Sequence, residues 1–177
     1  MDFLRLTWQD IENMCDRITE EIKKRGYKID VIVAVSRGGL IPARILSDRL
    51  DVRLITSISI VFYDDIGKRL DNPRLVQGIS NEKLIRYKNI LLCDDIVDTG
   101  ESLELAINHL KQLKPKNILS TSLLVKPHAK IYPDIFEQET DAWVIFPWET
   151  KETIREIGDR AILKELGYTE DEINKYQ

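Results

Sequence analysis

The sequence is organised around Ile90-Leu91-Leu92-Cys93-Asp94-Asp95-Ile96-Val97-Asp98-Thr99-Gly100-Glu101-Ser102. An apolar run leads directly into the adjacent carboxylates Asp94 and Asp95, and a third carboxylate, Asp98, follows two apolar residues later. A continuous apolar run is typical of a strand that is buried on both faces of a parallel sheet. Carboxylates at the end of such a strand lie at the edge where open α/β sheets bind their ligands.

The second half of this stretch has the composition of a phosphate site. Thr99-Gly100-Glu101-Ser102 forms a turn that opens a helix, and such turns offer backbone N–H groups and hydroxyls to an anion. Carboxylates and phosphate repel each other, so a divalent cation is needed between them. The stretch therefore predicts a ligand that combines phosphate with Mg²⁺.

Strand patterns alternate with helix patterns on both sides of this stretch. This order favours an α/β fold with an open, mostly parallel, doubly wound sheet and right-handed crossovers. The expected strands are 30–35, 52–62, 90–97, 117–125 and 142–146; the expected helices are 7–26, 40–50, 100–114, 150–166 and 169–176. Residues 63–88 form a long polar excursion with room for a hairpin, and polar segments of this length are often lids. Residues 128–140 are expected to be irregular.

Composition limits the class of protein. The 177 residues are 43% hydrophobic and carry a net charge of −4, which indicates a globular domain and argues against a broad nucleic-acid-binding surface. Cys15 and Cys93 are not in a C-x-x-C spacing, so we expect neither zinc nor a disulfide framework. No signal peptide or membrane span is recognisable, and a cytoplasmic protein is expected. His109 and His128 are interpreted as surface residues, because no metal-binding or nucleophile pattern surrounds them.

Three other interpretations of the acidic strand end fit the sequence less well. A nucleotide hydrolase also has such a strand, but it needs a Gly-x-x-x-x-Gly-Lys-Ser/Thr loop, which this chain lacks. A dinucleotide site needs Gly-x-Gly-x-x-Gly, which is also absent. A charged turn without function would leave three carboxylates repelling one another with no compensating cation.

Four motifs in one consistent order resemble the type I phosphoribosyltransferase family. Residues 92–102 are similar to its signature for 5-phosphoribosyl-1-pyrophosphate (PRPP), and Val35-Ser36-Arg37-Gly38-Gly39-Leu40 is similar to its pyrophosphate loop. Lys126-Pro127 and residues 141–149 resemble the purine end of the xanthine-guanine type and its small archaeal relatives. The resemblance covers about residues 3–149, and it implies a small hood at about 126–149 beside the sheet.

The resemblance implies a role for each matching residue of the PRPP site. Asp94 and Asp95 would hold the ribose hydroxyls and Mg²⁺, with Asp95 nearer the metal, and Asp98 would be the general base that accepts the purine imidazole proton. Thr99, Gly100, Glu101 and Ser102 would wrap the 5-phosphate. The pyrophosphate loop would use Ser36, Arg37 and Gly38, and a non-proline cis peptide is predicted at Ser36–Arg37.

The resemblance also implies roles for residues that would contact the purine and the pyrophosphate. Lys126 would donate to the 6-oxo group of the purine, Trp143 would stack on the base, and the Val144 backbone would contact its edge. Composition alone fits a solvated lysine and a core tryptophan equally well. Arg69 matches the family's pyrophosphate arginine in the lid, although a solvated basic loop has the same composition.

The implied protein is a Mg²⁺-dependent enzyme of purine salvage. It would convert PRPP and a 6-oxopurine (hypoxanthine, guanine or xanthine) into a nucleoside monophosphate and pyrophosphate. An adenine enzyme and a PRPP-sensing regulator without catalysis remain the alternatives. By analogy we expect a homodimer or homotetramer, without nucleic-acid or membrane partners. Residues 150–177 are expected to be a helical extension packed on the 1–149 domain or at a subunit interface.

Overall fold

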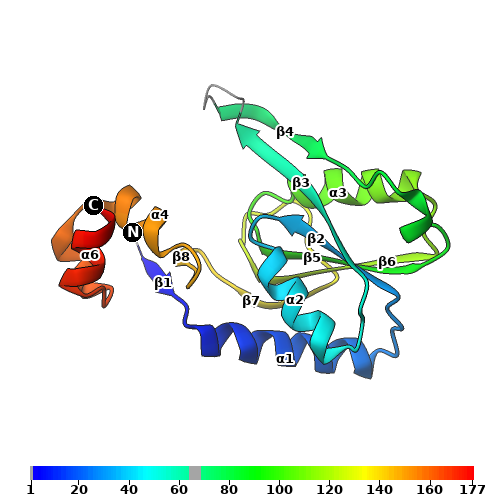
Figure 1. Ribbon diagram of the computed structural model, residues 1–177, viewed down its shortest axis with the longest axis horizontal. Helices are drawn as coiled ribbons and strands as arrows, with labels where there is room; N and C mark the ends of the chain where they lie inside the picture. Colours follow the sequence, from blue (N-terminus) through cyan, green and yellow to red (C-terminus); the bar gives the residue numbers. More distant parts are fainter. Residues whose placement is uncertain (1, 64–68) are drawn as a thin grey trace. The chain divides into compact units, whose positions relative to one another are not determined.

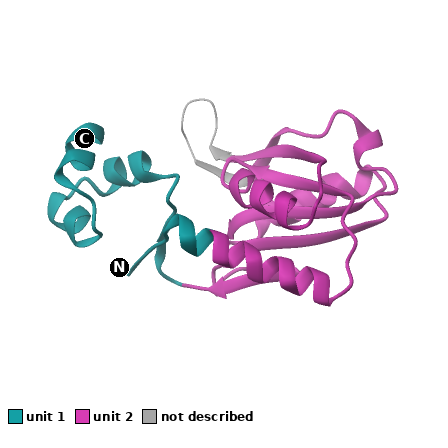
Figure 2. Cartoon of the chain, turned by 60° about the horizontal axis from the view of Figure 1, so that its bottom comes forward, with its two compact units in different colours: residues 1–11, 141–177 teal, residues 12–140 magenta. Residues whose placement is uncertain are grey.

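The computed structural model describes residues 2–63 and 69–177, and the side chains of residues 62–72 lie outside the described part. The chain divides into two compact units, residues 12–140 and residues 1–11 with 141–177, and the division falls within helix α1 (Trp8–Lys24) (Figure 2).

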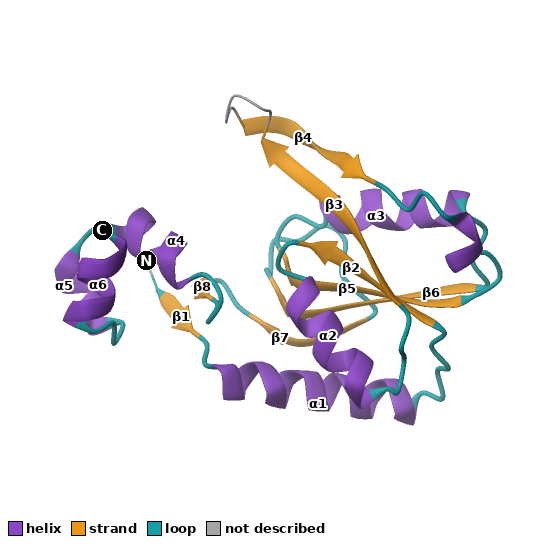
Figure 3. Cartoon of the chain, viewed as in Figure 1, coloured by secondary structure: helices purple, strands orange, loops and turns teal. Residues whose placement is uncertain are grey.

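A mostly parallel sheet forms the centre of the 12–140 unit (Figures 1 and 3). Six strands pair among the described residues, in the order β4-β3-β2-β5-β6-β7, and β4 alone runs antiparallel to its neighbour. The strands are β2 (Val31–Ser36), β3 (Ile55–Tyr63), β4 (Arg69–Gln77), β5 (Asn89–Val97), β6 (Asn117–Val125) and β7 (Ile135–Glu139). The predicted α/β class and sheet type are confirmed.

Helices cover both faces of this sheet, which explains its apolar central strands. Helix α3 (Glu101–Gln112) buries Leu103, Ala106 and Leu110 against one face, on which alternate residues of β2 and β5 also lie. Helix α2 (Leu40–Arg49) contacts β2 and β5 from the other side, where α1 also lies (Figure 1). Successive side chains of β2 therefore enter opposite halves of the core, and Val31 to Val35 are all buried.

Strand β7 corrects the expectation that residues 128–140 are irregular. It pairs with β6 in parallel at the edge of the sheet, with Thr121 opposite Ile135 and Ser122 opposite Phe136. Its sequence Ile-Phe-Glu-Gln-Glu is mostly polar, because an edge strand with exposed side chains needs little apolar surface. Strand β4 is the second arm of a β3–β4 hairpin, in agreement with the room for a hairpin expected in residues 63–88, and η1 (Glu82–Leu84) follows.

His109 is another correction, because it is not simply a surface residue. Its Nε2 atom lies 3.1 Å from the backbone N–H of Ile79, which donates a hydrogen bond to the ring. The ring also fills the space beside Gly78, where an added Cβ would lie 2.8 Å from its Cε1 atom. His109 thus fastens α3 to the segment after β4.

The second unit contains a short parallel sheet and three helices. Strand β1 (Phe3–Arg5) pairs with β8 (Trp143–Ile145), and the helices are α4 (Thr150–Ile157), α5 (Arg160–Glu165) and α6 (Glu170–Tyr176). A single helix over 150–166 was expected, but Gly158 adopts a φ of 64° and ends α4. Asp159 then caps α5 by accepting hydrogen bonds from the N–H groups of Ala161 and Ile162.

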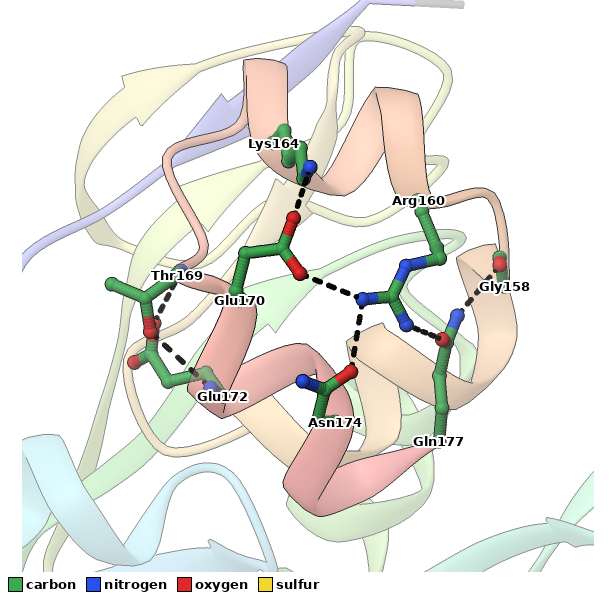
Figure 4. A network of polar contacts seen from close by, with 8 residues as sticks. All are labelled: Gly158, Arg160, Lys164, Thr169, Glu170, Glu172, Asn174 and Gln177. Atoms are coloured by element: carbon green, nitrogen blue, oxygen red, sulfur yellow. Dashed lines mark hydrogen bonds and ion pairs between the residues drawn. The ribbon is translucent and has the colours of Figure 1, made fainter.

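A small apolar core and a surface network hold the three helices together. Ile154, Leu163, Tyr168 and Ile173 are buried with Ile145 of β8. On the surface, Arg160 donates to Glu170, Asn174 and Gln177, and Lys164 pairs with Glu170 (Figure 4). Thr169 and Glu172 form the capping box predicted for the last helix. Nowhere in residues 2–63 and 69–177 is a helix both long enough and apolar enough to span a membrane.

Candidate active site

The carboxylates of Asp94 and Asp95 are almost fully buried near the end of β5, with 9% and 8% of each residue exposed. The Asp95 N–H donates to Asp94 Oδ1 at 2.9 Å, and the Ile96 N–H donates to Asp95 Oδ1 at 2.9 Å. Burial raises the pKa of both carboxyls above the ordinary range, because the charged forms lose their hydration. A cation at this position would compensate for that lost hydration.

The Ser36–Gly39 loop lies directly against this carboxylate pair. A Cβ added to Gly38 would lie 1.8 Å from Asp95 Oδ2, and one added to Gly39 would lie 2.5 Å from the backbone oxygen of Cys93. Only glycine allows so close an approach. The loop and the strand end, which are separated by more than fifty residues, therefore form one surface.

The loop also contains the predicted cis peptide. The Ser36–Arg37 bond is cis, as expected. The Ser36 hydroxyl donates to the backbone oxygen of Ile58 in β3 at 2.9 Å, so this side chain fastens the loop to the neighbouring strand. The Arg37 side chain is exposed.

The turn after β5 encloses a small cavity at the start of α3. Its volume is about 90 Å³, and it is lined by Asp94, Ile96, Val97, Asp98, Thr99, Gly100, Ser102 and Leu103. Gly100 is the N-cap of α3, and Thr99 Oγ1 accepts the Glu101 N–H at 3.4 Å. The first turn of a helix presents unpaired N–H groups and a positive partial charge, so this end suits an anion.

Asp98 has a partner that the sequence interpretation missed. Its Oδ1 atom lies 2.8 Å from Nε2 of His128, and both side chains remain more than half exposed. The two residues follow β5 and β6, which are neighbours in the sheet. The order of the strands could have indicated the contact, because carboxyl ends of adjacent parallel strands lie together.

The other predicted residues lie in separate parts of the chain. Lys126 directly follows β6, and its N–H donates to the backbone oxygen of Val97 at 2.9 Å. Trp143 and Val144 belong to β8 in the other unit, opposite Phe3 and Leu4 of β1, and Trp143 is 46% exposed. The main chain of Arg69 begins β4, and its side chain lies outside the described residues.

Comparisons with known proteins agree with this arrangement. The family model described as phosphoribosyl transferase domain matches residues 6–154. The chain is 35% identical over 122 residues to a xanthine-guanine phosphoribosyltransferase of Desulfotalea psychrophila, covering 68% of this chain and 70% of the relative. The chain is also 29% identical over 150 residues to the xanthine-guanine phosphoribosyltransferase of Gluconobacter oxydans, covering 84% of this chain and 85% of the relative.

A solved structure is similar to this chain in both fold and sequence. The purine phosphoribosyltransferase of Pyrococcus horikoshii superposes with a TM-score of 0.72 and 36% identity, over 84% of this chain and 94% of that one. The glycine loop, the buried carboxylate pair and the small cavity at the head of α3 thus occur in a chain whose sequence and fold both match known phosphoribosyltransferases. This chain belongs to the phosphoribosyl transferase domain family.

Proposed function

We propose that this protein transfers the phosphoribosyl group of PRPP to a 6-oxopurine, releasing pyrophosphate, in purine salvage. The observation that carries the proposal is the contact between the glycine loop and Asp95, beside the cavity at the head of α3. That arrangement offers one anion site on each side of a carboxylate pair, as a sugar with a phosphate at each end requires. The names of the Desulfotalea and Gluconobacter relatives support a purine as the acceptor.

The donor set fits Mg²⁺. Asp94 and Asp95 supply carboxylate oxygens, and Mg²⁺ is usually held by one or two carboxylates together with substrate oxygens and water. Asp94 and Asp95 would hold the ion, with Asp95 nearer to it. When bound, the ion would neutralise charge on the departing pyrophosphate.

The chain's own residues divide the remaining work. Thr99 to Ser102 bind the 5-phosphate with N–H and hydroxyl groups, and the Ser36–Gly38 loop binds pyrophosphate with Arg37. Asp98 accepts the imidazole proton of the purine as N9 attacks the ribose. Arg69 is assigned to pyrophosphate as part of the lid expected at residues 63–88, of which residues 64–68 lie outside the described part of the chain. Such a lid would exclude water from the reacting PRPP.

Lys126, Trp143 and Val144 are assigned to the purine. A lysine ammonium is a donor only, so it favours a base with an oxygen at position 6 and not the amine of adenine. Trp143 offers an exposed aromatic face for stacking, and Val144 offers main-chain groups to the edge of the base.

A base panel tests the proposal. The purified protein is mixed with PRPP, Mg²⁺ and one of adenine, hypoxanthine, guanine or xanthine, and nucleotide formation is followed. Turnover with one or more 6-oxopurines and none with adenine is expected. Turnover with adenine alone would overturn the role of Lys126, and PRPP binding without turnover on any base would leave a PRPP-sensing protein.

A further inference from the structure

The segment after β6 is fastened along the PRPP-signature loop at several points. The Lys126 N–H donates to Val97 O and the Lys130 N–H donates to Thr99 O, both at 2.9 Å. Gly100 lies against Ile131, where an added Cβ would be 2.6 Å from the backbone oxygen. The two chain segments therefore run together on either side of Asp98.

His128 lies on a tight turn within this fastened segment. The Ala129 N–H donates to Lys126 O at 3.0 Å and closes a four-residue turn with Pro127 in its second position. Proline has a fixed φ, which restricts this turn before any substrate binds. The turn therefore places His128 beside the loop that carries Asp98, and the ring contacts the Asp98 carboxylate.

The hydrogen-bonding chemistry of the contact fixes which group donates. An ionised carboxylate only accepts, so the Nε2 atom of His128 must carry the proton in its 2.8 Å contact with Asp98 Oδ1. Such a bond limits rotation of the Asp98 side chain. One carboxylate oxygen is used, and Oδ2 is left for another donor.

We propose that His128 is the positioning residue of the general base: it holds Asp98 Oδ1, so that Oδ2 faces the purine imidazole N–H. The inference rests on the proposed function. In the step concerned, N9 forms its bond to the ribose anomeric carbon as the imidazole proton passes to Asp98 Oδ2. The bond from that carbon to pyrophosphate breaks, and its electron pair leaves with pyrophosphate. His128 donates throughout and exchanges no proton.

Kinetics of three variants test this role. His128→Ala is expected to lower kcat about tenfold, the loss of one charge-assisted hydrogen bond, with the KM for PRPP within about twofold of wild type. The side chain of His128→Gln can still donate to Oδ1 and should recover most of kcat. Lys116→Ala, an exposed substitution before β6, is the control. Wild-type kcat in His128→Ala, or equally slow Ala and Gln variants, would overturn the proposal.

A double-mutant cycle adds a sharper criterion. If His128 acts through Asp98, then His128→Ala should cost little in an Asp98→Asn background. A full tenfold loss in that background would show that His128 acts elsewhere and would overturn the proposal.

A spectroscopic readout does not depend on turnover. The chain has only two histidines, and they are expected in opposite tautomers, since the ring of His109 accepts at Nε2 and the ring of His128 donates there. Nitrogen-15 spectra of the rings at pH 8 should show Nε2–H for His128, and Asp98→Asn should move the His128 signals only. Unmoved signals would overturn the contact. An inactive wild-type protein with the expected spectra would instead reject the proposed function and keep the contact.

Discussion

Gly38 and Gly39 are adjacent, yet they face different neighbours. The space beside Gly38 is filled by the carboxylate of Asp95, whereas Gly39 lies against backbone oxygens of Val35 and Cys93. A side chain can turn away from an added methyl group, but main chain inside a sheet cannot. Substitution of Gly38 should therefore affect ligand binding, whereas substitution of Gly39 should affect the stability of the fold.

Substitution of each glycine by alanine should show this difference. Gly38→Ala is expected to displace Asp95 and to weaken Mg²⁺-dependent PRPP binding by about 10- to 100-fold, with little change in Tm. Gly39→Ala is expected to lower the free energy of unfolding by about 1–3 kcal/mol, since it overpacks the junction of β2 and β5. Calorimetric titration and thermal unfolding measure the two effects. Unchanged PRPP affinity in Gly38→Ala would contradict the assignment of Asp95.

Asp98 provides the second test at this scale. Asp98→Asn keeps the shape of the side chain but removes its capacity as a base, so kcat should fall by about 10²–10⁴-fold. PRPP affinity should change little. Steady-state kinetics and PRPP titration distinguish the two effects, with Asp51→Asn, on an exposed turn, as the matched control. A fully active Asp98→Asn variant would remove this residue from the proton transfer.

At the scale of elements, the sequence predicted those strands and helices whose apolar residues form a regular pattern. The core positions of β2 and β5 are apolar because α2 and α3 cover the two faces of the sheet there, and the first helix begins at the Thr7–Asp10 capping box. Edge strand β7 lacks such a pattern. The contact between Asp98 and His128 joins residues thirty positions apart, and it depends on the order of strands in the sheet. The sequence pattern of a single segment does not reveal which strands are neighbours in the sheet.

The end of β5 should make stability depend on pH. Below the ordinary carboxyl pKa of 3.8, Asp94 is protonated in both the folded and the unfolded chain. As pH rises from there, the two carboxyls ionise first in the unfolded chain, because burial raises their pKa in the folded protein. The free energy of unfolding therefore falls as pH rises.

Asp94→Asn should therefore raise Tm at pH 8 and have less effect near pH 4. Its amide oxygen can still accept the Asp95 N–H, so the local structure is retained. Thermal unfolding across this pH range measures the difference, and Asp51→Asn again serves as the control. An equal gain at both pH values would show that ionisation is not the cause.

At the scale of the whole molecule, the two compact units divide the expected binding work. The residues assigned to PRPP lie within 12–140, whereas Trp143 and Val144 lie in the unit that contains α4, α5 and α6. Each unit has its own apolar core. A substitution that disrupts the core of α4, α5 and α6 should therefore leave the residues assigned to PRPP in place.

Ile173→Ala tests this division. Loss of a buried isoleucine from so small a core costs about 2–5 kcal/mol, enough to open the three helices locally. Limited proteolysis should then cut within 150–177, while PRPP affinity stays near wild type. Glu156→Ala, on an exposed position of α4, should remain resistant. A parallel loss of PRPP binding would show that the units are energetically coupled.

The pairing of β1 with β8 has a consequence for the order of folding. Phe3 and Trp143 are opposite each other in the register, although 140 residues separate them. A contact between such distant segments closes a long loop and forms late. On the ribosome, β1 must wait until β8 has been synthesised, whereas β2, β5 and β6 can assemble earlier. We expect a nascent chain that acquires its phosphate-binding parts first and the strand bearing Trp143 last.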